Sequence, residues 1–302
     1  MVKKGETKMK RSKGEKRLAC INVVMLTFVL LITLYPMLFV LNASFSESSA
    51  VYRGEVFLLP KGFNCDSYKR VFEHQAIMTG YANSLLYTVT GTIVNMAMTI
   101  IAAYPLSRKN LPFSKIIMGL IVFTMYFSGG IIPTYLVVDK WLGLGNTIFA
   151  LILPGAISVY NMIIVRSYFV SSIPSELNDA AMIDGCSDVR LLLSVVLPLS
   201  LPVLAVIAMY YMVSHWNAWF DALIYMSDKK YYPLQLVLKS VLIDGSESLV
   251  SESDLESALT QVMLSESIKY SIIVVASVPV LAIYPFLQRF FIKGVMVGAL
   301  KG

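Results

Sequence analysis

Charged side chains are scarce in this chain. Only 15% of its 302 residues are Asp, Glu, Lys or Arg, while 57% are hydrophobic. A water-soluble domain of ordinary composition carries about a quarter charged residues. Most of the folded chain must therefore contact something less polar than water, which excludes an ordinary water-soluble domain.

Residues that build metal and catalytic sites are also few. Cys20, Cys65 and Cys186 are scattered over the chain, so no disulfide framework follows from them. The two histidines, His74 and His215, lack metal-ligand spacing. Neither a phosphate-binding G-x-x-x-x-G-K-[ST] loop nor a G-x-S-x-G nucleophile elbow occurs. We expect no catalytic residue, metal site or cofactor on this chain.

Long apolar runs, in contrast, are abundant. A helix needs roughly 20 residues to cross a bilayer, and six runs reach or approach that length. Interior prolines such as Pro154, Pro198 and Pro202 are tolerated in kinked spanning helices. We predict an all-α integral membrane protein with six transmembrane helices. The runs cover residues 18–41, 81–106, 116–138, 142–165, 191–220 and 270–288.

The basic residues predict the orientation, because short cytoplasmic loops retain Lys and Arg. Residues 1–17 carry eight of them, which places this basic tail inside. Six spans then put both termini in the cytoplasm, with 16 Lys/Arg and 6 Asp/Glu inside and 9 and 13 outside. The net charge of +6 is thus a signal of topology and calls for no nucleic acid, although such an arm could bind RNA or anionic lipid. The run 18–41 is about twice as long as the apolar core of a cleaved signal peptide, which favours an uncleaved first spanning helix.

This topology divides the chain into four parts. A basic cytoplasmic tail (1–17) precedes the first helix and an external segment (18–80), which has room for a short amphipathic helix near residues 66–72. The core of five spanning helices (81–293) contains a cytoplasmic loop (167–198) and an external loop (227–269). A cytoplasmic tail (294–302) ends the chain.

The cytoplasmic loop contains a polar stretch, PSELNDAAMIDG, that has the signals of a short surface helix. Pro174 presets a helix start, Ser175 can cap it, and Glu176 complements the positive helix end. Gly185 is placed to end the helix in a left-handed cap. We predict a helix over residues 175–184.

One face of this predicted helix carries almost no side-chain bulk. Ala181 and Gly185 lie one turn apart, as do Ala180 and Asp184, so another protein's backbone could approach closely. The alternative is an interfacial helix that rests on lipid headgroups. Such a helix should have a Lys/Arg face and large apolar anchors, and we expect this one to lack both. Docking of a protein is favoured.

The same segment resembles a family signature. Asp179-Ala180-Ala181, three residues, Gly185, nine residues, Val195, one residue and Leu197-Pro198 match E-A-A-x3-G-x9-I-x-L-P of binding-protein-dependent ABC importer permeases, with Asp for Glu and Val for Ile. The segments at 152–169, 173–177 and 290–302 are similar to the carbohydrate-uptake branch, and to the second permease of maltose-type importers. The resemblance covers about residues 70–302.

This resemblance implies a type I importer transmembrane domain in a bacterial cell membrane. The expected partners are a homologous second permease, a cytoplasmic ATPase dimer that binds ATP and Mg, and an extracytoplasmic solute-binding protein; the expected substrate is a sugar or oligosaccharide. The loop helix would dock in the ATPase and transmit its closure. The implied ATPase-coupling residues are Glu176, Asp179, Ala180, Ala181, Asp184, Gly185, Leu197 and Pro198, and the implied ATPase-contacting tail is Gly298, Ala299, Leu300, Lys301 and Gly302.

Candidates for the substrate pathway gather at the end of the fifth run. Aromatic faces and polar side chains hold sugars, and polar groups within a span are functional candidates. Ordinary interfacial belts also contain Trp and Tyr, and Tyr231, Tyr232 and Gln235 share this ambiguity. The candidates are His215, Trp216, Asn217, Trp219 and Asp221.

Two other functions stay open at this point. An intramembrane enzyme would need paired acidic, basic or nucleophilic groups within the spans, which are essentially uncharged apart from His215. A secondary transporter would need no ATPase partner. The identity of the sugar does not follow from the sequence.

Overall fold

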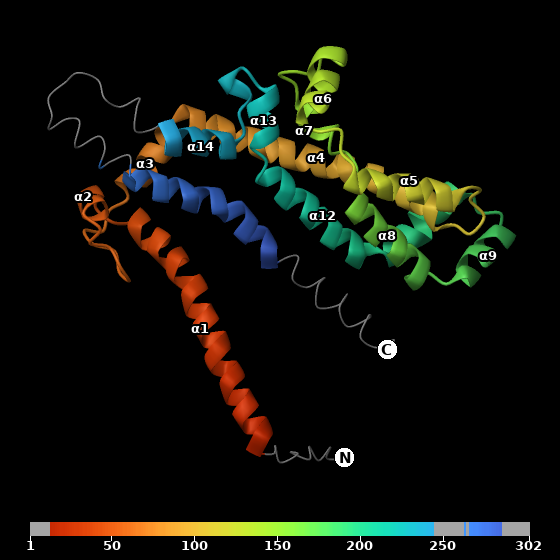
Figure 1. The fold of residues 1–302 in the computed structure, drawn as a ribbon, viewed down its shortest axis with the longest axis horizontal. Helices are drawn as coiled ribbons and strands as arrows, with labels where there is room; N and C mark the ends of the chain where they lie inside the picture. The colour runs from red at the N-terminus through yellow and green to blue at the C-terminus, as the bar shows by residue number, and fades with distance from the viewer. Residues whose placement is uncertain (1–12, 245–262, 264–265, 286–302) are drawn as a thin grey trace. The chain divides into compact units, whose positions relative to one another are not determined.

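The computed structural model describes residues 13–244, 263 and 266–285 (Figure 1). All regular elements in these ranges are helical. The chain forms two compact units, residues 1–69 with 249–274 and residues 70–248 with 275–302. The elements are α1 (Lys13–Ser44), α2 (Ser48–Tyr52), α3 (Asp66–Glu73), α4 (Gln75–Ser107), α5 (Ser114–Tyr126), α6 (Ile131–Tyr135), η1 (Leu136–Trp141), α7 (Ile148–Ile152), α8 (Val159–Ser172), α9 (Ser175–Ile183), α10 (Asp188–Leu191), η2 (Leu192–Val196), α11 (Leu197–Leu199), α12 (Leu201–Trp216), α13 (Phe220–Tyr225), η3 (Lys229–Tyr231), α14 (Leu234–Asp244) and an unlabelled helix, Glu266–Pro285.

The predicted apolar runs take three different forms. Runs one, two and six are continuous helices long and apolar enough to cross a membrane: α1, α4 and Glu266–Pro285. Runs three and five are bent pairs, with 110° between residues 114–126 and 131–141 and 85° between residues 188–199 and 201–216. Run four consists of the shorter helices α7 and α8. The described residues thus contain three to five candidate spans, against six predicted runs.

The breaks in runs three to five follow from glycine and proline. Gly130 lies between α5 and α6 with a φ of +87°, which favours glycine. Pro154 lies between α7 and α8. Pro202 has no N–H to give to the carbonyl of Pro198, and the 85° bend falls between these two prolines. Each break therefore has a local cause in the sequence, but the sequence alone does not give the angle between the two helices.

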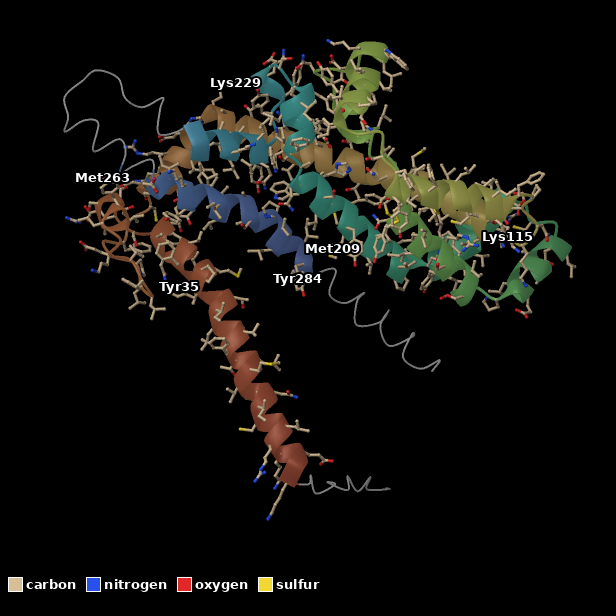
Figure 2. All side chains as sticks on the ribbon, viewed as in Figure 1. Tyr35, Lys115, Met209, Lys229, Met263 and Tyr284 are labelled. Carbon is tan, nitrogen blue, oxygen red and sulfur yellow. The ribbon has the colours of Figure 1, made fainter. Side chains whose placement is uncertain are left out.

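The first unit contains α1, an apolar helix whose side chains are mostly exposed. None of its most apolar 18-residue window is buried. Figure 2 shows side chains projecting along its whole length, Tyr35 among them. Only at its C-terminal end does α1 join a small core, in which Ala43 packs with Ala50 and Val56. A surface this apolar is suited to lipid or to another membrane helix.

In the second unit, α4 is the central element. It packs along α12, α8 and α14. The main core lies among α4, α8, α12 and the segment α9 to α11, with Met162, Val165 and Ile207 fully buried. Helix α14, which the sequence did not predict, buries Leu234 and Leu236 although it belongs to the predicted external loop.

Candidate functional site

Helix α9 lies where the sequence predicts it. The predicted range was 175–184 and the observed helix is Ser175–Ile183, so it begins at the residue expected to cap it. Gly185 follows with a φ of +69°. The N–H of Cys186 donates to the carbonyl of Ala181 at 2.9 Å, which is the hydrogen bond of a glycine-terminated helix end. The predicted left-handed cap is confirmed.

The structure separates the two faces of α9. Ala181 and Cys186 pack against the main core, whereas Ala180, Asp184 and Gly185 are exposed. A Cβ atom at Gly185 would meet nothing within 4 Å. Glu176 is also exposed, while the side chain of Asp179 lies outside the described residues. The open face therefore carries small and acidic residues.

The expectation that α9 lacks large apolar anchors is wrong at two positions, because Leu177 is 40% exposed and Ile183 is 86% exposed. Ile183 lies at the end of the helix, next to the open face. The helix period turns the side chain of Ile183 away from the core, because Ala181 occupies the inner face. An exposed isoleucine beside bare backbone offers a partner protein an apolar contact.

Tyr104 attaches the loop of α9 to the end of α4. Its hydroxyl donates to the carbonyl of Asp188 at 3.0 Å. The guanidinium of Arg108 lies 4.3 Å from the Tyr104 ring centroid and also donates to the hydroxyl. The Nε of Arg166, on α8, donates to the carbonyl of Leu106 at 2.8 Å. The loop is thus hydrogen-bonded to the end of α4, and α4 in turn to α8.

The chain beyond the loop returns directly into the core. Leu191, just before the π-helical turn η2, and Val196, its last residue, are buried. Leu197 and Pro198, which close the predicted coupling signature, differ in exposure. Leu197 is half-buried against the core, and Pro198 is exposed. Helices α10 to α12 thus link α9 to the bend at Ser200.

His215 belongs to a polar network inside the second unit. Its Nε2 lies 2.8 Å from Oδ1 of Asn95, and Nδ2 of Asn95 donates to the carbonyl of Gly155 at 2.5 Å. Asn95 is almost fully buried. The imidazole lies against Gly91, where a Cβ would be only 2.5 Å from Nε2. His215 therefore joins α12 to α4 and, through Asn95, to the break before α8.

Trp216 is held inside the unit and does not line an open surface. It is 4% exposed, its Nε1 donates to the carbonyl of Ala276 at 3.0 Å, and its ring meets that of Tyr81 edge to face. These contacts assign Trp216 to packing between α12, α4 and the last helix.

Replacing Trp216 with Phe is expected to lower stability and leave substrate affinity unchanged. The substitution removes the hydrogen bond to the Ala276 carbonyl, worth about 0.5–1.5 kcal/mol, and leaves part of the volume of a buried indole empty. The checks are thermal unfolding of the purified chain and the apparent KM of uptake. Trp219→Phe is the contrasting variant, since Trp219 is half-buried at the surface beside Lys239. A raised KM in Trp216→Phe would contradict this assignment.

The remaining three candidates lie at the surface. Asn217 is exposed and donates from its side chain to Val213 of its own helix at 2.8 Å. Trp219 is half-buried, and the ammonium of Lys239 lies 3.6 Å from its ring centroid. Asp221 is exposed as a residue, yet burial of its carboxyl raises the pKa above the ordinary value. Trp219 and Lys239 thus present an aromatic face and a cation together.

The polar face of α4 is the part of the site that the sequence did not identify. Five buried polar residues lie three or four positions apart on this helix, a spacing that could have revealed it. Two hydroxyl contacts fasten it: Thr99 to Tyr211 at 2.7 Å, and Ser84, which accepts the N–H of Leu234 at 2.8 Å. The five are Ser84, Thr88, Thr92, Asn95 and Thr99.

Several predictions lie wholly or partly outside the described residues. The five tail residues, Gly298, Ala299, Leu300, Lys301 and Gly302, are all beyond them, and so are residues 1–12 of the basic tail and residues 245–262 and 264–265 of the external loop. Within residues 13–244, 263 and 266–285, no group of three or more His, Cys, Asp or Glu side chains is arranged to hold a metal ion.

A protein family described as the binding-protein-dependent transport system inner membrane component matches residues 76–297. Two similar proteins come from Bacillus subtilis strain 168. Protein LplC is 40% identical over 93% of this chain and 94% of its own length. The polygalacturonan/rhamnogalacturonan transport system permease protein YtcP is 41% identical over 90% of this chain and 94% of its own.

Two solved structures are also similar. One is a bacterial ABC transporter involved in the import of the acidic polysaccharide alginate; it is 30% identical, with a TM-score of 0.84 over 94% of this chain and 99% of that one. The other is a bacterial alginate ABC transporter in complex with a periplasmic protein that holds an alginate pentasaccharide. At 15% identity and a TM-score of 0.59, over 92% of this chain and 94% of that one, it shows likeness of fold.

Proposed function

The chain belongs to the family of binding-protein-dependent transport system inner membrane components, and from this premise we propose that it is the permease subunit of an ATP-driven oligosaccharide importer. It is an integral membrane transport subunit, and its relative of 41% identity, YtcP, is named as a transport system permease. ATP and Mg would be bound by a separate cytoplasmic ATPase dimer. A second permease would complete the pathway, and an extracytoplasmic binding protein would deliver the substrate.

The observation that carries the coupling role is the open face of α9. Gly185 and Ala180 leave backbone accessible, Ile183 offers an apolar contact, and Glu176 and Asp184 add negative charge. Tyr104 and the core contacts of Ala181 join this face to the spanning helices. Closure of the ATPase would thus move α9, α4 and α12 together. Asp179, Leu197 and Pro198 complete the coupling signature.

The orientation that this function needs agrees with the charge distribution. The basic residues 1–17 and the coupling loop both fall on the side richer in Lys and Arg. Both termini would then lie in the cytoplasm of a bacterial cell. The tail 298–302 would contact the ATPase, as in similar maltose-type permeases.

The substrate is best described as an oligosaccharide that contains uronic acids. YtcP is named for the transport of polygalacturonan and rhamnogalacturonan, and the first solved relative imports an acidic polysaccharide. In this chain Lys239 lies over Trp219 and Lys230 over Tyr231, so cations accompany the aromatic rings of α13 and η3. An aromatic ring suits the C–H face of a sugar, and an ammonium suits its carboxylate.

Uptake into proteoliposomes tests the function. The tagged chain is purified with its copurifying subunits, reconstituted, and supplied with ATP inside and binding protein outside. We expect ATP-dependent entry of oligogalacturonates that a neutral oligosaccharide of equal length does not inhibit. Purification without an ATPase, together with uptake driven by an ion gradient, would instead indicate a secondary transporter. Equal uptake of the neutral oligosaccharide would refute the proposed preference for acidic substrates but not the role as an ATP-driven importer.

A further inference from the structure

An exposed apolar segment lies close to the C-terminal end of α1. Phe57, Leu58 and Leu59 are 65%, 66% and 77% exposed, and Phe63 is 69% exposed. Three consecutive large apolar residues at such exposure are unusual for a surface in water. We call residues 57–59 with Phe63 the apolar tip.

Hydrogen bonds fix the apolar tip to the end of α1. The side chain of Asn42 donates to the carbonyl of Leu58 at 2.9 Å. Glu47 N–H donates to the carbonyl of Lys61 at 2.9 Å, and Lys61 N–H donates to Oγ of Ser46 at 3.1 Å. The ring of Phe63 stacks on Phe45 with the centroids 5.5 Å apart. The tip therefore has a defined position beside residues 42–47.

Gly62 makes this close return possible. Its φ is +61°, and a Cβ there would be 2.9 Å from the Cβ of Glu47. Only glycine combines the left-handed backbone with such an approach. The sequence Pro60-Lys61-Gly62 thus turns the chain back along Glu47 after the apolar residues.

The length of α1 places the apolar tip at the depth of the lipid headgroups. The apolar run 18–41 has 24 residues, so as a helix it is about 36 Å long. The hydrocarbon core of a bilayer is about 30 Å thick. If one end of the run lies at one boundary of this core, Leu41 lies within about 6 Å of the other. Asn42, and with it Leu58, is then at the membrane surface.

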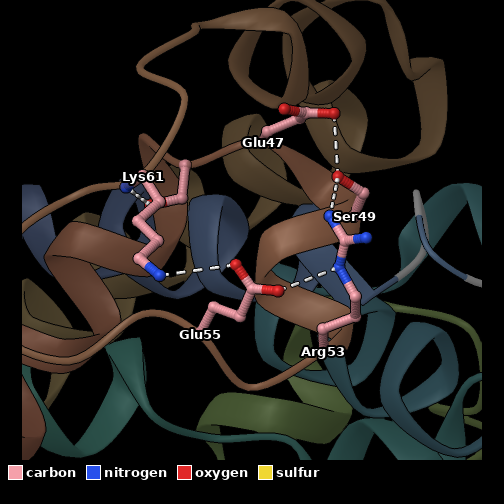
Figure 3. A network of polar contacts seen from close by, with 6 residues as sticks. Glu47, Ser49, Arg53, Glu55 and Lys61 are labelled. Atoms are coloured by element: carbon pink, nitrogen blue, oxygen red, sulfur yellow. Dashed lines mark hydrogen bonds and ion pairs between the residues drawn. The ribbon is translucent and has the colours of Figure 1, made fainter.

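The charged groups beside the tip are paired with one another (Figure 3). Glu55 contacts both Arg53, at 3.2 Å, and Lys61, at 3.4 Å. Ser49 donates to Glu47 at 2.8 Å. Such pairing reduces the cost of bringing these charges close to a membrane, because the partners replace part of the lost water.

We propose that the apolar tip inserts into the headgroup region of the bilayer and holds the C-terminal end of α1 at a fixed depth. Its occupant is lipid, because the tip is hydrogen-bonded to the end of a helix that is long and apolar enough to span a membrane. Interfacial segments bury their apolar side chains about 5–10 Å into this region. The proposal concerns only α1 and the apolar tip beside its end. It does not depend on which sugar is transported.

Spin-label accessibility tests the position of the tip. Cys20, Cys65 and Cys186 are first replaced by Ser, and the full chain with its copurifying subunits is placed in lipid nanodiscs. Single nitroxides are then attached at Leu58→Cys, at Val29→Cys within α1 and at Lys69→Cys on α3. We expect oxygen to reach the Leu58 label better than a water-soluble nickel chelate does, as at Val29, and the opposite order at Lys69.

Two outcomes would overturn the proposal. Access of the nickel chelate to Leu58 equal to that at Lys69 would place the tip in water. Poor access of both reagents would show that another protein covers it. Uptake by the cysteine-free parent confirms that the labelled complexes are functional.

Discussion

Gly185→Trp is expected to reduce ATP-driven uptake by about tenfold or more, the change that a loss of 1.4 kcal/mol in docking energy produces. Two effects add. A left-handed conformation costs an L-residue roughly 1–2 kcal/mol, which loosens the end of α9. The indole also fills space that is empty in this chain and that the ATPase would occupy. The measurements are uptake and substrate-stimulated ATP hydrolysis of the reconstituted complex.

Gly143→Trp is the matched control for this prediction. Gly143 has a φ of +62° and no atom within 4 Å of a Cβ, so it reproduces the backbone strain and the added bulk away from α9. Gly185→Asn separates the two effects, because asparagine tolerates the left-handed region. Activity of Gly185→Trp equal to that of Gly143→Trp would exclude docking at this face.

Gly91→Ala is expected to destabilise the protein by about 1–3 kcal/mol, the usual cost of overfilling a packed interior. The new methyl group would be 2.5–2.8 Å from three atoms of the His215 ring. The ring must then move, which breaks its 2.8 Å contact with Asn95. Thermal unfolding in detergent measures the effect.

The design allows both a control and a rescue. Gly119→Ala lies within α5 with open space around the new Cβ, so alanine should be neutral or favourable there. His215→Ala removes the clash, and the double variant Gly91→Ala/His215→Ala should be less unstable than the sum of the single changes. If the two losses of stability simply add in the double variant, contact with the imidazole is not the reason why a larger residue at position 91 destabilises the protein.

The sequence predicted the helical class, the extent of α9 and its glycine cap, because these depend on local signals. Pro174, Glu176 and Gly185 act on the helix ends within one turn. The sharp bends were not predicted, since proline in a spanning helix is compatible with a mild kink or a complete break. Helix α14 was missed because its eleven residues directly precede an acidic, serine-rich stretch.

The partners of polar residues were the harder part of the site. The position of Trp216 near a membrane surface makes it a candidate either for sugar contact or for an interfacial belt, and the structure shows it buried with its Nε1 donating to Ala276. Asn95 and His215 are 120 residues apart, and periodicity says which face each occupies but not what it meets. Ligand-facing and structural aromatic residues have the same composition, so only packing separates them.

The polar face of α4 has a consequence for how the protein is made. The hydroxyl of Thr99 and the Oδ1 of Asn95 contact Tyr211 and His215, which follow 112 and 120 residues later in the chain, whereas the Nδ2 of Asn95 donates to Gly155, 60 residues later. Lipid cannot supply hydrogen bonds to such groups. We therefore expect the polar face of α4 to complete these hydrogen bonds only after α12 has been synthesised.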